Sequence, residues 1–259
     1  MMEIQIKKAV RAGNSSAVLL PRAWLDKEVR VELLEKTPEK ILHNVIEIAK
    51  NHINLESIIG VYLAGSYARK EEDEGSDIDI LIVTKDIDKK MISDGIYNIL
   101  IISLELLNQK LKKDLLPIGQ MLREAKPLLN SAYLDSINIK ATKRNVKWYI
   151  ETTEGKLNII KKAVEIAKRR ESKYLDDIVA YTLVLRIRTL HIIEKLIKNE
   201  EYSKKEFMKL IRDIGGENAY ERYLAVKNNS KNGEGISIWE TDKLYGYLKD
   251  ELNKVKNLL

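Results

Sequence analysis

Two short stretches of this chain combine residue types that can bind and transfer phosphate groups. Gly65-Ser66 ends an apolar segment, 58–64, that has the pattern of a buried strand. At such a turn glycine permits close approach to the backbone, while the serine hydroxyl and free N–H groups can donate to phosphate oxygens. Asp77 and Asp79 follow on a second strand, where a two-residue spacing places both carboxylates on one face. Adjacent carboxylates repel each other without a cation, so the pattern predicts a Mg²⁺ site beside a phosphate-binding turn.

The elements that would hold these residues can be predicted from local signals. Thr37-Pro38 suits a helix cap followed by proline at the first helical position. The apolar face of that helix is Ile41, Val45, Ile48 and Ala49. We expect strands over Ile58–Ala64, Asp77–Val83 and Gly95–Ser103. Beyond Leu104 the pattern is helical to the end, with breaks near Pro117, Pro127, Gly215-Gly216 and 228–235.

This arrangement resembles the minimal nucleotidyltransferase branch of the polymerase-β superfamily, in which Gly-Ser, a spacer and Asp-x-Asp follow in strand–turn–helix–strand order. The resemblance implies an α/β (α+β) nucleotidyltransferase domain. It implies that Asp77 and Asp79 are catalytic residues that ligate Mg²⁺, and that Gly65, Ser66 and Arg69 bind the nucleotide. The expected enzyme activity is transfer of a nucleoside monophosphate from ATP, or another nucleoside triphosphate, to a hydroxyl acceptor, with pyrophosphate leaving.

One position departs from this family pattern. Active members usually place a third carboxylate on a later strand, where this chain has Asn98. An asparagine side chain cannot act as a base near neutral pH. Asp94 or Glu124 could substitute, although each also suits a capping or surface role. The alternative function is therefore a catalytically weak or inactive member that acts as a DNA-binding antitoxin or transcriptional regulator. Position 70, glycine in most relatives, is Lys70 here.

The first 36 residues have a different, strand-like pattern. Residues 4–6 and 29–33 alternate, and Gly13-Asn14-Ser15 suits a turn before an apolar run that Pro21 stops. This segment resembles the AbrB/MazE-type swapped-hairpin modules, which implies a homodimer that binds duplex DNA. The DNA-binding residues would be Lys8, Arg11 and Asn14. A hairpin that only dimerises, or that packs on the transferase domain, would explain the same pattern.

The C-terminal half resembles the helical companion domains of nucleotidyltransferases, including the HEPN class. HEPN nucleases carry an Arg-x4–6-His pair, and Arg186 and His191 fit that loose spacing. The ordinary expectation is that Arg186 and Arg188 form ion pairs with Asp176, Asp177 or nearby glutamates. A third interpretation is that these arginines hold the phosphates of the nucleotide or the acceptor.

The length and composition of the chain limit the classes of protein that it can belong to. The chain has 259 residues, which suffices for the expected domains over 1–36, 37–135 and 136–259. It has no cysteine, which excludes disulfides and thiolate sites, and it lacks a long apolar run or signal sequence. We therefore expect a cytoplasmic protein without a membrane segment. The net charge is −4 over 37–139 and +8 over 140–259, which suits a metal site between surfaces that meet a polyanion.

Overall fold

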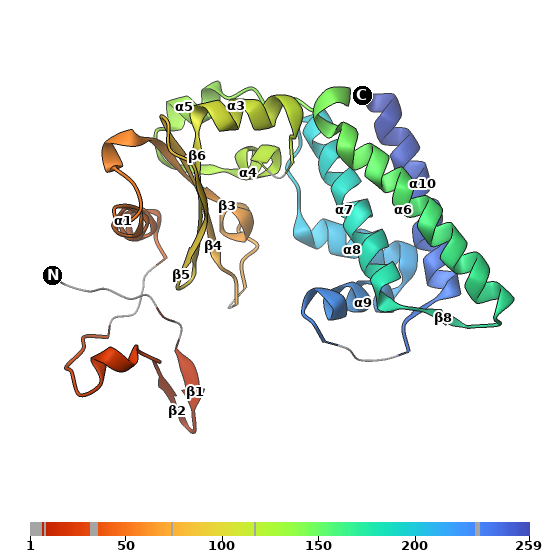
Figure 1. The fold of residues 1–259 in the computed structure, drawn as a ribbon, viewed down its shortest axis with the longest axis horizontal. Coiled ribbons are helices and arrows are strands. Elements are labelled where there is room, and N and C mark those ends of the chain that lie inside the picture. Colours follow the sequence, from red (N-terminus) through yellow and green to blue (C-terminus); the bar gives the residue numbers. More distant parts are fainter. Residues whose placement is uncertain (1–6, 8, 32–35, 74, 117, 231–233) are drawn as a thin grey trace. The chain divides into compact units, whose positions relative to one another are not determined.

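The computed structural model of this protein describes residues 7, 9–31, 36–73, 75–116, 118–230 and 234–259 (Figure 1). The chain divides into two compact units. The first joins Met1–Asn108 to Glu124–Asn138, and the second joins Gln109–Arg123 to Ile139–Leu259. A mixed sheet lies in the first unit and helices dominate the second, which confirms the predicted fold class. The three-domain division of the chain stays a prediction.

A five-stranded sheet forms the centre of the first unit, in the order β5-β6-β4-β3-β7. The strands are β3 (Ile58–Ala64), β4 (Ile78–Thr84), β5 (Lys89–Asp94), β6 (Tyr97–Ser103) and β7 (Lys126–Leu129). β4 runs parallel to β6, and the other neighbouring pairs are antiparallel. β4 therefore lies in the middle of the sheet, where its side chains are flanked by those of β3 and β6.

Helix α1 (Pro38–Ala49) packs its apolar face into the core of this unit. The Thr37 side chain accepts a hydrogen bond from the Lys40 N–H, and Pro38 occupies the first turn, as predicted. The four predicted apolar residues of the helix are all buried, and they share one core with the three alternating isoleucines of β4: Ile41, Val45, Ile48 and Ala49 with Ile78, Ile80 and Ile82. Because side chains alternate along a strand, burial of the three isoleucines against α1 places Asp79 on the opposite face of β4.

Both edge strands of the sheet lie outside the three strands predicted from sequence. The predicted helix break near Pro127 is present between α4 (Ile118–Glu124) and α5 (Ser131–Ser136), but the expectation of helices alone beyond Leu104 is wrong, because the strand β7 fills this break. Proline lacks an N–H, and it is tolerated in a strand at a sheet edge, where one side needs no partner. β7 meets this condition, since it pairs with β3 alone.

Short helices precede, connect or follow these strands. They are η2 (Leu55–Ser57), α2 (Gly65–Arg69), α3 (Leu104–Lys113), α4 (Ile118–Glu124) and α5 (Ser131–Ser136).

The N-terminal segment forms a hairpin without a core of its own. β1 (Val10–Ala12) pairs antiparallel with β2 (Ser15–Ala17), so the predicted turn is present, and η1 (Arg22–Trp24) follows. None of the described residues from 7 to 31 is buried. The expected third strand is not seen over 29–31, while 4–6 and 32–33 lie outside the described residues.

The second unit is a helical bundle with its own core. Its long helices are α6 (Lys143–Arg169), α7 (Asp177–Lys198), α8 (Lys204–Gly215), α9 (Glu217–Lys227) and α10 (Ile238–Leu258). A small ribbon of β8 (Tyr174–Leu175) and β9 (Ile236–Ser237) interrupts the helical pattern. α7 and α10 supply many of the buried apolar residues, and the predicted break at Gly215-Gly216 separates α8 from α9. Within the described ranges, no helix combines the length and apolar character needed to cross a membrane.

Candidate active site

The Gly65-Ser66 turn joins the buried end of β3 to helix α2 in a conformation that requires glycine. Gly65 has a φ of +68°, in the left-handed region. A Cβ at this position would lie 2.1 Å from the Oδ2 atom of Asp79. Glycine therefore allows the turn and the aspartate to approach each other. At the other end of α2, Lys70 also adopts a left-handed conformation, with a φ of 56°, which glycine would adopt without strain.

Asp77 and Asp79 lie at the start of β4, as the spacing predicted. Asp77 immediately precedes the strand and is exposed, whereas Asp79 is partly buried. Asp79 is in register with Ala64 on β3 and with Asn98 on β6. The structure therefore brings the end of the Gly-Ser strand, the second aspartate and Asn98 side by side across three strands.

The electrostatics of this site fit a bound cation. Burial and the neighbouring carboxylate of Asp77 raise the pKa of Asp79, while Arg69 and the Asn98 side chain oppose the shift. A divalent cation between the two carboxylates would relieve their repulsion. Among the described residues, no group of three or more His, Cys, Asp and Glu is placed to hold a metal. Two carboxylates still suit Mg²⁺, which often takes its other oxygen ligands from substrate phosphates and water.

Asn98 acts in this structure as a hydrogen-bond bridge. Its Nδ2 atom donates to Oδ2 of Asp77 at 3.2 Å, and its Oδ1 atom accepts from the hydroxyl of Ser93 at 2.8 Å. The amide group thus turns its donor, not its oxygen, toward the aspartate. Asp94, considered above as a substitute carboxylate, ends β5 opposite Tyr97.

Glu124 is the one carboxylate from outside the motif that reaches the turn among the contacts described. Its Oε1 atom accepts a hydrogen bond from the N–H of Gly65 at 2.9 Å, and its Oε2 atom pairs with Arg69. The Nε atom of Arg69 also donates to Glu71 at 3.0 Å. The sequence presents Glu124 as a candidate substitute for the third carboxylate or as a capping or surface residue; in the structure it accepts from the backbone of Gly65, 59 residues earlier. A charged residue between Leu122 and Ala125, both buried, is the local signal that could have identified it.

A comparison with known protein families identifies the family to which this site belongs. The nucleotidyltransferase domain family matches residues 42–214, more than half of the chain. The chain belongs to this family. The predicted enzyme class, a nucleotidyltransferase, is confirmed, and the match continues from the sheet unit into the helical one.

Spectinomycin adenyltransferase AAD(9) from Enterococcus faecialis, solved with ATP and spectinomycin, is 13% identical to this nucleotidyltransferase, with a TM-score of 0.41. The alignment covers 82% of this chain and 99% of that chain. A comparison with curated proteins gave no match.

The predicted DNA-binding residues of the nucleotidyltransferase lie in or before the N-terminal hairpin. Arg11 belongs to β1, where its Nε atom donates to the carbonyl of Gly13 at 3.2 Å, and Asn14 lies in the turn. Both are exposed. Lys8 lies outside the described residues.

Arg186 and His191 both lie on α7 but contact different neighbours. Arg186 donates to the hydroxyl of Thr152 at 2.9 Å and lies over the Trp148 ring. The His191 ring instead packs near Tyr202 and Phe207. The two side chains do not share a surface within these contacts.

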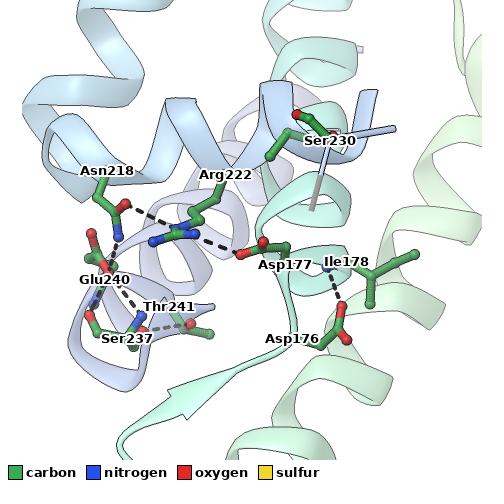
Figure 2. Close-up of polar contacts among 10 residues, drawn as sticks. Asp176, Asp177, Ile178, Asn218, Arg222, Ser230, Ser237, Glu240 and Thr241 are labelled. Atoms are coloured by element: carbon green, nitrogen blue, oxygen red, sulfur yellow. Dashed lines mark hydrogen bonds and ion pairs between the residues drawn. The ribbon is translucent and has the colours of Figure 1, made fainter. Parts of the chain in front are cut away.

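The expected ion pairs of Arg186 and Arg188 with the two aspartates at the start of α7 are wrong for the described contacts. Asp176 caps the helix by accepting the Ile178 N–H at 2.8 Å. Figure 2 shows Asp177 facing Arg222 of α9, with 3.8 Å between the charged atoms. Each aspartate is thus engaged by nearer groups.

Proposed function

We propose that this nucleotidyltransferase transfers a nucleoside monophosphate from ATP, or another nucleoside triphosphate, to a hydroxyl acceptor. The close approach of Gly65 and Asp79 is the observation that carries this proposal. It places a glycine turn with a serine hydroxyl directly beside paired carboxylates. Gly65 would leave space for the triphosphate, and Ser66 would donate to its oxygens. Arg69, also predicted to bind the nucleotide, lies nearby with two carboxylate partners.

Asp77 and Asp79 are the residues that would hold Mg²⁺ in this proposal. When bound, the ion would neutralise charge on the phosphates and orient them for in-line displacement. The acceptor hydroxyl would release its proton to solvent as its oxygen forms a bond to the α-phosphorus, and the bond from the α-phosphorus to the bridging oxygen would break, with pyrophosphate as leaving group. Asn98 would keep Asp77 in position through its amide donor.

Labelled ATP provides the direct test. The purified protein is incubated with cell extract, Mg²⁺ and ATP labelled at either the α- or the γ-phosphate. We expect acceptor labelling from α-labelled ATP only, because the β- and γ-phosphates leave together. Asp79→Asn should abolish labelling, while Asp86→Asn, at an exposed aspartate outside the site, should preserve it. Labelling from the γ-phosphate, or equal labelling by Asp79→Asn, would contradict the proposal.

A second candidate function rests on the N-terminal hairpin. Five large apolar side chains within 10–31 are more than two fifths exposed, and no described residue there is buried: Val10, Leu19, Leu25, Val29 and Val31. A segment that buries so little area cannot offset the backbone entropy of ordering it, roughly 1–2 kcal/mol per residue. We propose that it pairs with a second copy to form a homodimer and binds duplex DNA through Lys8, Arg11 and Asn14.

Light scattering and salt-dependent DNA binding test this second function. The full chain should be a dimer, and a truncated protein that begins at Thr37 should be a monomer. Arg11→Ala with Asn14→Ala should weaken duplex binding, and affinity should fall with a log–log salt slope of about −0.9 per phosphate contacted. Monomers in both cases would remove the dimer proposal. A dimer whose DNA affinity resists both substitutions would leave dimerisation alone. If no acceptor is labelled while DNA is bound, the regulator alternative replaces the enzyme proposal.

A further inference from the structure

A buried carboxylate from a distant part of the chain holds the turn of the candidate site. Glu124 ends α4, and its side chain is only 4% exposed. It is one of few buried charged residues described in the chain. A buried carboxylate is costly unless charge partners and hydrogen bonds compensate it. Glu124 has both kinds of partner, and both belong to the Gly65–Arg69 helix.

The first contact fixes the backbone of the turn. The N–H of Gly65 donates to Oε1 of Glu124 at 2.9 Å. Gly65 is in the left-handed conformation and is the first residue of α2. A hydrogen bond to its N–H therefore constrains the direction in which Ser66 and the rest of α2 leave the strand. The same N–H is directed to Glu124 in the ligand-free protein, so Ser66 and later groups are the donors that remain for phosphate.

The second contact fixes the other end of α2. The guanidinium of Arg69 lies between Glu124 and Glu71, and both carboxylates are buried at least as deeply as the arginine. Burial lowers the pKa of Arg69, but the two ion pairs outweigh it and keep the group charged. Glu124 therefore links the backbone of the turn at Gly65 to the arginine at the far end of α2.

We propose that Glu124 is a positioning residue that holds the Gly65-Ser66 turn and Arg69 in their nucleotide-binding arrangement before the nucleotide arrives. This inference rests on the proposed function of the turn. A turn that is already ordered loses less binding free energy to rearrangement, and by analogy with the outer-shell partners of metal ligands, removing such a partner should change affinity by about 10–100-fold. Glu124 is thus expected to influence nucleotide affinity without contacting the nucleotide.

Three variants of the full chain separate this role from others. Glu124→Ala removes both contacts. Glu124→Gln keeps an oxygen for the Gly65 N–H but loses the charge that Arg69 needs, and it remains informative if the alanine variant does not fold. Glu72→Gln is the control, since this glutamate is exposed and lies close in sequence. The readouts are hydrogen exchange of the Gly65 amide by NMR without nucleotide, the Kd of Mg–ATP by calorimetry, and kcat for acceptor labelling from α-labelled ATP in cell extract.

The expected pattern differs for each variant. Glu124→Ala should speed exchange of the Gly65 amide more than about tenfold and raise the Kd of Mg–ATP by about 10–100-fold. Glu124→Gln should restore slow exchange and raise the Kd less. Glu72→Gln should match the wild type in every readout.

Several results would overturn the inference. Unchanged exchange in Glu124→Ala would show that the hydrogen bond is not made, and faster exchange with an unchanged Kd would show that it has no role in binding. A loss of kcat in Glu124→Gln at the wild-type Kd would identify an acid–base group in place of a positioning residue. A wild-type protein that does not bind Mg–ATP would overturn the proposed function together with this role, whereas the first three results would overturn this role alone.

Discussion

Two glycine turns in this chain have nearly the same backbone conformation and very different surroundings. Gly65 has a φ of +68° and Gly13 has a φ of +62°. A Cβ on Gly65 would meet the carboxylate of Asp79 at 2.1 Å, whereas a Cβ on Gly13 would meet no atom within 4 Å. The first turn leaves a strand whose last five residues are buried, and the second joins two strands of three residues with no buried side chain.

The difference shows what makes a sequence motif into a site. Around Gly65, the buried strand β4 places Asp79 beside the turn, β6 places Asn98 beside Asp79, and Glu124 holds the backbone of the turn. Around Gly13, apolar side chains remain exposed, and these are the side chains that we propose a second copy covers. The turn chemistry alone is similar in the two places. The geometry at Gly65 comes from its neighbours.

The largest expected effect compares one apolar side chain from each region. Ile80 is fully buried in β4, and Leu19 is 71% exposed. Ile80→Ala should lower the free energy of opening of the sheet by about 2–5 kcal/mol, because it leaves a cavity. Leu19→Ala should change it by less than about 0.5 kcal/mol. Hydrogen exchange of the β3 and β4 amides measures both values. Equal losses in the two variants would contradict the comparison.

The two glycines provide a second comparison. Gly65→Ala should raise the Kd of Mg–ATP more than about tenfold, because the new methyl group displaces the Asp79 carboxylate from the site and strains the backbone by about 1–2 kcal/mol. Gly13→Ala should incur only the backbone strain and leave the Kd unchanged. Calorimetric titration with Mg–ATP distinguishes the two substitutions. Weaker nucleotide binding in Gly13→Ala would show that the hairpin contributes to the site.

A smaller effect concerns the stability of the aspartate pair without metal. The folded protein raises the pKa of Asp79 above its ordinary value of 3.8, chiefly through burial and the charge of Asp77. The folded state therefore binds this proton more tightly than the unfolded state, and the resulting stability is lost as the pH rises above that value. Asp79→Asn should then unfold at a higher temperature than the wild type at pH 7, with a smaller difference near pH 4.

The exposed Asp86 provides the control for that measurement. Asp86→Asn should change the melting temperature little at either pH. Metal-free wild-type protein that is as stable as Asp79→Asn at pH 7 would show that the carboxylates do not repel each other in the folded state.

Elements with strong local signals could be predicted from the sequence. Helix α1 begins where Thr37-Pro38 predicts, and β3 has the predicted bounds. β4 and β6 begin one and two residues later than expected. In each of these elements, a cap or an apolar alternation lies within a few residues of the chain, so no distant contact is needed to identify it.

Features that depend on distant contacts could not be predicted in this way. β7 contains a proline and exists only because it pairs with the edge of β3, some 65 residues earlier in sequence. The buried neighbours of Glu124 could have indicated that this residue is buried, but nothing near it in the sequence identifies Gly65 as its partner. Arg186 contacts Thr152 on another helix, where the sequence favoured aspartates close by. In all three cases the contact joins residues that are far apart in the sequence, so only the folded chain determines which residues meet.

Binding of Mg–ATP by the wild type and by Asp77→Ala with Asp79→Ala tests the central assignment most directly. The Asp79 carboxylate lies against the Gly65 turn, Asp77 lies two residues before it, and the proposal makes these two the only protein carboxylates that hold the metal. Isothermal titration should detect binding to the wild type and a loss of affinity of about 100-fold or more in the double variant, which equals about 2.7 kcal/mol. A double variant that binds Mg–ATP as tightly as the wild type would show that the nucleotide site lies elsewhere.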